Sequence, residues 1–310
     1  IYTHMYTLSL HDALPISHVR PDGDTIGSAA ALCRALRDCG QTAYLLPNPE
    51  ITATYAPYAA PYWAPEGWQA EHIVSVDIAD ASLLPENAQP YRDRIELAID
   101  HHPSQTFFAR NTCLEADSAA CGEIVYEIIQ HLTALTADIA LPLYVAVSTD
   151  CGGFQYGNTT ARTHRIAAAL MDVVDVAAVN KALFRTKSRV RLAMESRMVA
   201  DMKLFDHQRV VVMEIPLSLR QEMQATDADI EELSALPALV EGTDCGVTLR
   251  ELRPGTVKVS VRTGPRVDAC ALCRILGGGG HHAASGATVE GTLNEARMAV
   301  LAAYRKVIGA

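Results

Sequence analysis

The chain has 310 residues, 49% of them hydrophobic, which is enough for a soluble α/β enzyme of two domains at the usual size of about 100–200 residues each. A formal net charge of −10 excludes a protein that coats long duplex nucleic acid, because that binding depends on clustered lysine and arginine. No hydrophobic run approaches the roughly 18–20 residues needed to cross a bilayer, so we expect no membrane partner. The eight cysteines are scattered rather than spaced as a disulfide framework, so we expect a reduced, cytoplasmic protein.

Residues 1–15 lack the features expected at the start of an α/β domain. They show neither helical periodicity nor helix-capping residues, whereas a helix and a clean apolar strand would normally come before the first polar motif. We therefore expect residues 1–15 not to be native sequence, although the strand-like run Ala13–Ser17 begins within them.

Residues 16–180 are predicted to form the first domain, because short β-rich runs alternate there with helical stretches such as Ser28–Cys39 and Gly122–His131. Such alternation is typical of a mostly parallel sheet with helices on both faces. The four predicted strands are Ala13–Ser17, Ile73–Asp77, Ile95–Asp100 and Leu143–Asp150.

A long helical stretch is predicted from about Val176 to Phe205, and we interpret residues 181–205 as a helical connector between two domains. It carries a group of cations in an otherwise acidic protein. Such a group on a connector is usually a solvated face, so we leave it out of the predicted site. Its members are Lys181, Arg185, Lys187, Arg189, Arg191, Arg197 and Lys203.

Residues 206–310 are predicted to form a smaller α/β domain. Its strands are followed by a short helix, the glycine run Gly277–Gly280 and a closing helix near Leu293–Ile308. The predicted strands are Val210–Ile215, Asp244–Leu252 and Thr256–Arg262.

Acids and histidines gather where the four predicted strands of the first domain end. Because the carboxyl ends of parallel strands form one crevice at the edge of a sheet, we expect these side chains to meet in one place. A single Asp after a strand is usually a helix cap or a turn residue, but four such endings argue against coincidence. The residues are His18, Asp22, Asp24, Asp77, Asp100, His101, His102 and Asp150.

So many carboxylates and imidazoles in one crevice would be electrostatically costly unless cations neutralised them. Mixed histidine and carboxylate ligation suits Mn²⁺ best, and Mg²⁺, Co²⁺ or Zn²⁺ are also compatible with it. Two such ions about 3.5–4 Å apart can clamp the attacking and leaving oxygens of an in-line displacement. The pattern therefore predicts two divalent metal ions and hydrolysis of a phosphate ester.

The motifs resemble those of the DHH phosphoesterase family. One departure is Cys151, where members of that family usually have threonine. The resemblance covers the chain from His18 onward. The similar segments are Ser17–Ser28 for the first motif, Asp77 for the second, Asp100-His101-His102 for the signature that names the family, and Thr149-Asp150 for the fourth.

The resemblance implies a role for each of these residues. His102 would face the scissile phosphate, where it could stabilise charge or protonate the leaving group. Asp100 would orient the histidine pair without binding metal. One metal ion would be bound by His18, Asp22 and Asp77, and the other by Asp24, Asp77, His101 and Asp150.

The glycine run Gly277–Gly280 lets backbone N–H groups approach an anion, but it lacks the Gly-Lys-Ser/Thr of a P-loop. Together with the following His281–Gly286 it resembles the glycine-histidine motif of DHHA1 domains, with Ser285 in place of an alanine. The resemblance implies that this second domain binds the nucleotide and that catalysis occurs in the cleft between the domains. The implied substrate-binding residues are Arg262, Gly278, Gly279, Gly280 and His281.

The resemblance also implies the substrate class. Family members with this pair of domains hydrolyse short oligoribonucleotides (nanoRNA) and 3′-phosphoadenosine 5′-phosphate (pAp) to nucleoside monophosphates, and a homodimer is compatible with them. A phosphodiesterase of linear or cyclic dinucleotides stays open as an alternative. The acidic composition disfavours a single-strand exonuclease, and the glycine-histidine motif disfavours a pyrophosphatase. A nucleotide-binding regulator that lacks activity is disfavoured because every expected metal ligand is present.

Overall fold

The computed structural model describes residues 12–309, with only the backbone of Glu231 and Glu232. The chain divides into two compact units, and the division falls between Thr186 and Lys187. The prediction that residues 1–15 are not native falls mostly on 1–11, which lie outside the described residues. Within 12–309, no helix is long and apolar enough to cross a membrane.

The first unit is built on a parallel sheet of four strands in the order β1-β2-β3-β4. Three of the four strands predicted from the sequence are present, and the parallel arrangement is confirmed. All four residues of β1 are buried, as in the strands of a sheet covered on both faces. The strands are β1 (Ala13–Ile16), β2 (His72–Val76), β3 (Ile95–Asp100) and β4 (Asn111–Leu114).

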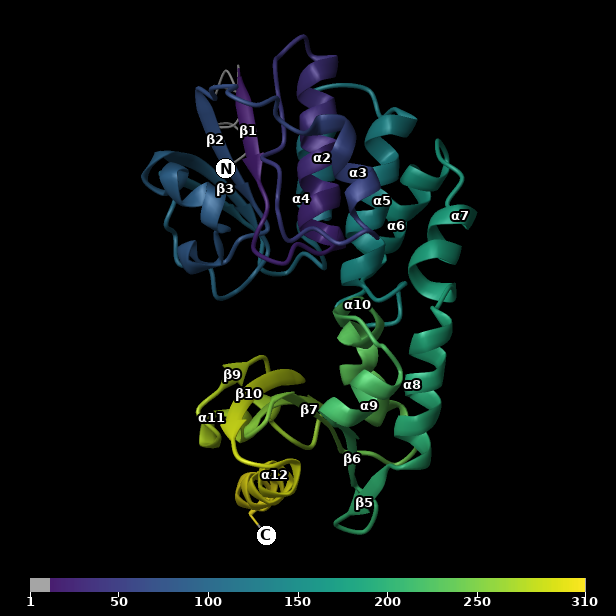
Figure 1. Cartoon of the computed structure of the whole chain (residues 1–310). Coiled ribbons are helices and arrows are strands. Elements are labelled where there is room, and N and C mark those ends of the chain that lie inside the picture. The colour runs from purple at the N-terminus through teal and green to yellow at the C-terminus, as the bar shows by residue number, and fades with distance from the viewer. Residues whose placement is uncertain (1–11, 310) are drawn as a thin grey trace. The chain divides into compact units, whose positions relative to one another are not determined.

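The two faces of this sheet are covered by different kinds of element. One face packs against α-helices in the largest core of the chain, and Figure 1 shows these helices gathered beside the strands. The other face packs against the 3-10 segments Ala81–Leu83 and Glu86–Arg94 through residues such as Leu84 and Ala88. The α-helices are α2 (Gly23–Asp38), α3 (Ala56–Ala59), α4 (Cys121–Gln130), α5 (Ala137–Asp150), α6 (Ala161–Met171) and α7 (Ala177–Asn180).

The predicted strand Leu143–Asp150 is wrong, because these residues form the second half of α5. Every residue from Leu143 to Ser148 is buried, so no polar face marks the helical period. A short, fully apolar run cannot be assigned to helix or strand from its periodicity. Asp150 therefore ends a helix and not a strand.

Helices α2 and α5 pack closely, because α2 carries glycine where they meet. A Cβ atom on Gly27 would lie 2.2 Å from the carbonyl oxygen of Pro142 in α5. Only glycine allows this approach without displacement of backbone. The contact brings Asp24, at the start of α2, and Asp150, at the end of α5, into one region.

The predicted continuous helix from Val176 to Phe205 is also wrong. After α7, a π-helical turn spans Lys181–Arg185, and a new helix, α8 (Arg189–Ala200), begins after Ser188. The Ser188 side chain accepts a hydrogen bond from Arg191 N, which is a helix N-cap and explains the interruption. The chain then forms a strand, β5 (Lys203–Phe205).

The second unit contains a mixed sheet of six strands in the order β5-β6-β7-β8-β10-β9. One face of this sheet packs against α11 and α12, and the other packs against α8 and α9. The predicted strands and closing helix are confirmed. The further elements are β6 (Val210–Ile215), α9 (Leu217–Glu222), α10 (Asp227–Ile230), β7 (Cys245–Arg253), β8 (Thr256–Thr263), α11 (Ala269–Ile275), β9 (Gly279–Gly280), β10 (Ala284–Glu290) and α12 (Leu293–Ile308).

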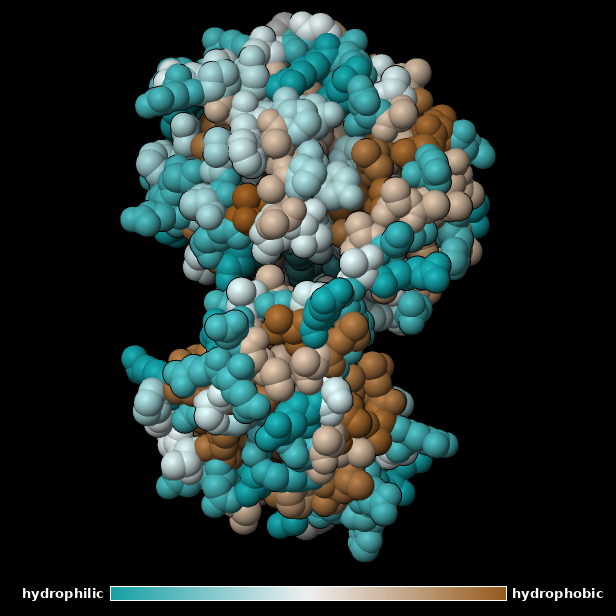
Figure 2. Space-filling model, turned by 45° about the vertical axis from the view of Figure 1, so that its right-hand side comes forward, coloured by the Kyte–Doolittle hydropathy of each residue, from teal (hydrophilic) through white to brown (hydrophobic). Residues whose placement is uncertain are grey.

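The surface of each unit is mixed in character. Figure 2 shows hydrophilic side chains over the visible face of each unit, with hydrophobic side chains in separate groups between them. Exposed hydrophobic residues include Leu192 and Leu239 in the second unit and Tyr156 and Met171 in the first.

Candidate metal centre and anion pocket

The turn between β1 and α2 places three of the predicted ligands together. Asp22 is the N-cap of α2, and its Oδ1 accepts hydrogen bonds from Asp24 N (3.0 Å) and Thr25 N (3.1 Å). The Thr25 hydroxyl donates to Val76 O at 2.8 Å, which ties the first turn of α2 to the end of β2. The helix cap thus holds Asp22 and Asp24 beside the carboxyl end of the sheet, where His18 also lies.

Asp77, directly after β2, is the centre of the cluster. Its backbone has a φ of 61°, in the left-handed region, and its N–H donates to Ile99 O at 2.8 Å. The side chain is 3% exposed, and its Oδ1 has no hydrogen-bond partner among the described residues. Backbone strain of this kind is concentrated at functional sites, and an unpartnered buried carboxylate oxygen is costly. A cation bound to the Asp77 carboxylate would account for both features.

Two histidines direct the same ring nitrogen toward Asp77. The Nδ1 atoms of His18 and His101 bond to the carbonyl oxygens of Val19 (2.8 Å) and Ser118 (3.1 Å). Because a carbonyl oxygen only accepts, each Nδ1 carries a proton, and in the neutral ring Nε2 then keeps its lone pair. Histidines that bind metal ions are usually held in this way.

The distances around these two nitrogens suit metal ligation. His18 Nε2 lies 3.6 Å from Asp22 Oδ1 and 3.8 Å from Asp77 Oδ2. Two donors about 2.0–2.2 Å from one ion are separated by about 3–3.5 Å, so the observed separations are only slightly wider. His101 Nε2 lies 3.8 Å from Asp24 Oδ2, 3.5 Å from Asp77 Oδ1 and 3.7 Å from Asp150 Oδ2.

The donor atoms fall into three overlapping groups, and the atoms of each group lie within 4.8 Å of one another. Asp77 belongs to two of the groups and His101 also belongs to two, so the three groups form one continuous cluster. They are His18, Asp22 and Asp77; Asp24, His101 and Asp150; and Asp77, His101 and His102.

The electrostatics of the cluster also call for a cation. Burial, followed by the charges of Asp150 and Asp22, raises the pKa of Asp24 well above its usual range. Burial and the charge of Asp24 raise the pKa of Asp77 in the same way. Ionised carboxylates so close together repel one another, and divalent cations offset this repulsion. The residues present therefore fit divalent metal ions.

Asp24 also holds helix α4 in place. Its Oδ1 accepts hydrogen bonds from the Ser28 hydroxyl (3.0 Å) and Gly122 N (2.9 Å), and its Oδ2 accepts one from Cys121 N (2.6 Å). A carboxylate at a helix N-terminus is stabilised by the exposed N–H groups there. The same side chain thus joins α2, α4 and the cluster.

Asp100 is fully buried and bonds to the histidine pair. Its Oδ1 accepts from His101 N (2.8 Å) and His102 N (3.2 Å) and lies 2.8 Å from His102 Nδ1. Its Oδ2 accepts from Gln105 Nε2 at 2.6 Å. The hydrogen bond to Asp100 raises the pKa of His102. Asp100 therefore orients His102, and Gln105 in turn orients Asp100.

The second unit has a concave pocket of about 460 Å³ over β7, β8 and β10. Arg262, Gly279, Gly280 and His281 line it, together with Arg250 and Lys258. The lining that the structure describes includes no carboxylate, although the whole chain carries a net charge of −10. Local positive charge in an acidic protein favours a small anionic ligand at this pocket.

Similarity to known proteins agrees with this geometry. Residues 14–147 match the model of the DHH family, N-terminal domain. The curated "Bifunctional oligoribonuclease and PAP phosphatase NrnA" of Thermus thermophilus is 32% identical over 296 residues, which cover 94% of this chain and 88% of the relative. The chain belongs to the DHH family. A relative of the same name from Bacillus subtilis is 24% identical and covers 91% of each chain.

A solved structure of another protein shows that the fold is shared. The exopolyphosphatase-related protein from Bacteroides fragilis superposes with a TM-score of 0.90 at 21% identity, over 99% of this chain and 96% of that one. This likeness concerns the fold of the DHH-family chain and not its activity.

The structure of this DHH-family member brings most of the predicted site residues together. The histidines and acids predicted as metal ligands all fall into the groups described above, and Asp100 and His102 adjoin them. Gly278 does not line the pocket of the second unit. A Cβ atom there would lie 2.1 Å from Gly286 O, so Gly278 is required for strand packing. The remaining predicted substrate residues do line that pocket.

Sequence reasoning missed Gln105, Arg250 and Lys258. A single polar residue in a loop gave no signal for Gln105. Lys258 could have been found, because it lies four residues before Arg262 on the same strand and therefore on the same face. Arg250 could have been found next, because it lies directly opposite Lys258 on β7.

Proposed function

We propose that the protein is a metal-dependent phosphoesterase that hydrolyses short oligoribonucleotides and pAp to nucleoside monophosphates. The observation that carries this proposal is the buried Asp77 carboxylate, which has an unpartnered oxygen and two histidine Nε2 atoms directed toward it. The substrate class is supported by the names of the relatives that are 32% and 24% identical.

The first unit would hold two divalent ions, and Mn²⁺ suits the mixture of imidazole and carboxylate donors. When bound, such ions acidify a water molecule and neutralise charge on a phosphate. His18, Asp22 and Asp77 would hold one ion, and Asp24, Asp77, His101 and Asp150 would hold the other.

His102 is the residue proposed to act on the leaving group. Its Nδ1 is bonded to Asp100, so its Nε2 is the nitrogen left to face a phosphate ester. There it would stabilise charge or give a proton to the leaving oxygen. Asp100, with both oxygens bonded, keeps the imidazole in that orientation.

The second unit would bind the anionic or nucleotide end of the substrate. Arg250, Lys258, Arg262 and His281 line its pocket, and charge-assisted hydrogen bonds from such groups to phosphate are strong. Gly279 and Gly280 are exposed and line the same pocket, and without side chains they would let the backbone come close to an anion.

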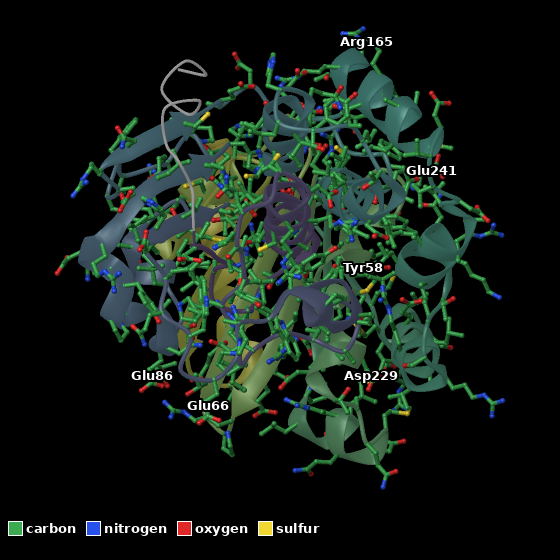
Figure 3. All side chains as sticks on the ribbon, turned by 90° about the horizontal axis from the view of Figure 1, so that it is seen from above. Tyr58, Glu66, Glu86, Arg165, Asp229 and Glu241 are labelled. Carbon is green, nitrogen blue, oxygen red and sulfur yellow. The ribbon has the colours of Figure 1, made fainter. Side chains whose placement is uncertain are left out.

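The test is an assay with Mn²⁺ and four separate substrates: a 5′-labelled diribonucleotide, a long single strand, pAp and pyrophosphate. The matched variants are Asp77→Asn and Arg165→Ala. Arg165 is an exposed residue of α6 that points away from the first unit (Figure 3). Cleavage of the diribonucleotide or pAp by the wild type and Arg165→Ala, but not by Asp77→Asn, is the expected result. Preference for pyrophosphate or the long strand would refute the proposal.

A further inference from the structure

An exposed aromatic side chain lies in the loop that follows Asp150, one of the acids of the metal cluster. Tyr156 is 60% exposed, in the loop that follows Asp150 at the end of α5. Its loop neighbour Phe154 packs inward, with its ring 5.4 Å from the ring of His164 and 6.1 Å from that of Tyr144. The loop is therefore anchored by Phe154 and presents Tyr156 to solvent.

This loop is rigidly built. Gly152, Gly153 and Phe154 follow one another in the left-handed region, with φ of 56°, 66° and 68°. Tyr156 N donates to Cys151 O at 3.1 Å. Asn158 Nδ2 donates to Asp150 O at 3.1 Å and to Ala119 O at 2.9 Å. These bonds fix the loop to the end of α5 and to the segment before α4.

The Tyr156 ring is held over the backbone next to Asp150. A Cβ atom on Gly152 would lie 2.4 Å from Cε1 and Cζ of the ring, so the ring occupies the space that any other residue at 152 would fill. Gly152 is two residues from Asp150, whose Oδ2 belongs to the cluster. The ring is thus supported on one side by the backbone of Gly152, in the loop that begins directly after Asp150.

We propose that Tyr156 is a stacking platform for a nucleobase of the substrate. The proposal rests on the proposed function and names a binding group for it. A flat ring with one supported face and open surface matches the π-face that every nucleobase offers, whatever its sequence. Because the ring is already held in place, little conformational entropy is lost when a base stacks on it.

The kinetic test compares Tyr156→Ala, Tyr156→Phe and Met171→Ala, with a diribonucleotide and its abasic analogue as substrates. Met171 is another exposed hydrophobic residue of the first unit, at the far end of α6 from the loop. Tyr156→Ala should raise KM for the diribonucleotide about 5- to 150-fold, as base–aromatic stacking predicts, and leave kcat unchanged. Tyr156→Phe should restore the wild-type KM, and KM for the abasic analogue should not respond.

A second readout is independent of turnover. In the Asp77→Asn background, a dinucleotide that contains 2-aminopurine should lose fluorescence on binding, and the loss should disappear when Tyr156 is also changed to Ala. If wild type hydrolyses the diribonucleotide and Tyr156→Ala has an unchanged KM and unchanged quenching, the platform is overturned. If Tyr156→Ala lowers the melting temperature and leaves KM unchanged, the ring has a structural role and the platform is also overturned. Quenching by Tyr156 without hydrolysis by wild type would support the platform and refute the proposed function.

Discussion

Asp77 combines a strained backbone with a buried carboxylate. Few residue types adopt its φ of 61° readily, and Asp and Asn are among them. The choice of substitution therefore matters: alanine would change both the backbone preference and the side chain, whereas asparagine changes only the charge.

We expect Asp77→Asn to lower kcat at least about 100-fold, by comparison with the loss of one group that stabilises transition-state charge. Without metal, its melting temperature should equal or exceed that of the wild type, because a neutral amide replaces an unpartnered buried carboxylate. Steady-state kinetics and thermal unfolding in EDTA measure the two effects. A large loss of stability in EDTA would show that Asp77 has a structural role.

Gln105 provides a second prediction at this scale. Gln105→Leu removes the donor to Asp100 Oδ2 and so loosens His102, and we expect kcat to fall about 10- to 100-fold with KM unchanged. A control outside the site is Gln89→Leu, which removes one bond from an exposed side-chain amide to Leu84 O. An increase in KM at constant kcat would contradict the positioning role.

The polar residues of the cluster could be predicted because each lies at or close to one end of a buried element. Their hydrogen-bond roles could not. Asp22 caps helix α2, and Asp24 binds the N-terminus of α4. Both residues therefore have the capping role that a single Asp usually has, and both also face the cluster. Sequence spacing does not reveal that one carboxylate serves two purposes.

At the scale of the element, the alternation of side chains along strand β8 places its cationic residues on the face that lines the pocket. Lys258 and Arg262 lie on one face of β8, toward the pocket of the second unit. We expect Lys258→Ala to raise KM for pAp about 10-fold with kcat unchanged, since hydrogen bonds to charged groups contribute about 1.5–3 kcal/mol. Lys306→Ala, an exposed lysine on α12, is the control. A fall in kcat with unchanged KM would contradict a role for Lys258 in substrate binding.

A helix with a capping sequence and a polar face could be predicted, whereas a helical segment without a polar face could not. The closing helix Leu293–Ile308 begins with a capping box between Thr292 and Glu295 and agrees with its prediction. The buried half of α5 has no polar face and was mistaken for a strand. The position of Asp150 in the cluster survived that error, because the end of α5 and the ends of the strands reach the same region.

At the scale of the molecule, metal binding should act on one unit. The candidate ligands all belong to the first unit, and the second has its own sheet and cores. At about 100 times its Kd, each bound Mn²⁺ should stabilise the first unit by about 2.7 kcal/mol and raise the melting temperature of that unit by roughly 5–10 °C. Hydrogen exchange should slow near β2, β3 and α5 and stay unchanged in 187–310. Equal protection in both parts would contradict this.

The left-handed backbone of Asp77 also bears on how the protein can evolve. Asparagine and glycine, the residues that best tolerate this conformation, are each one base change from an aspartate codon. A single mutation can therefore remove the central ligand and leave a folded chain whose cationic pocket is intact. On the proposed function, a nucleotide-binding protein without hydrolytic activity is therefore one mutational step from this enzyme.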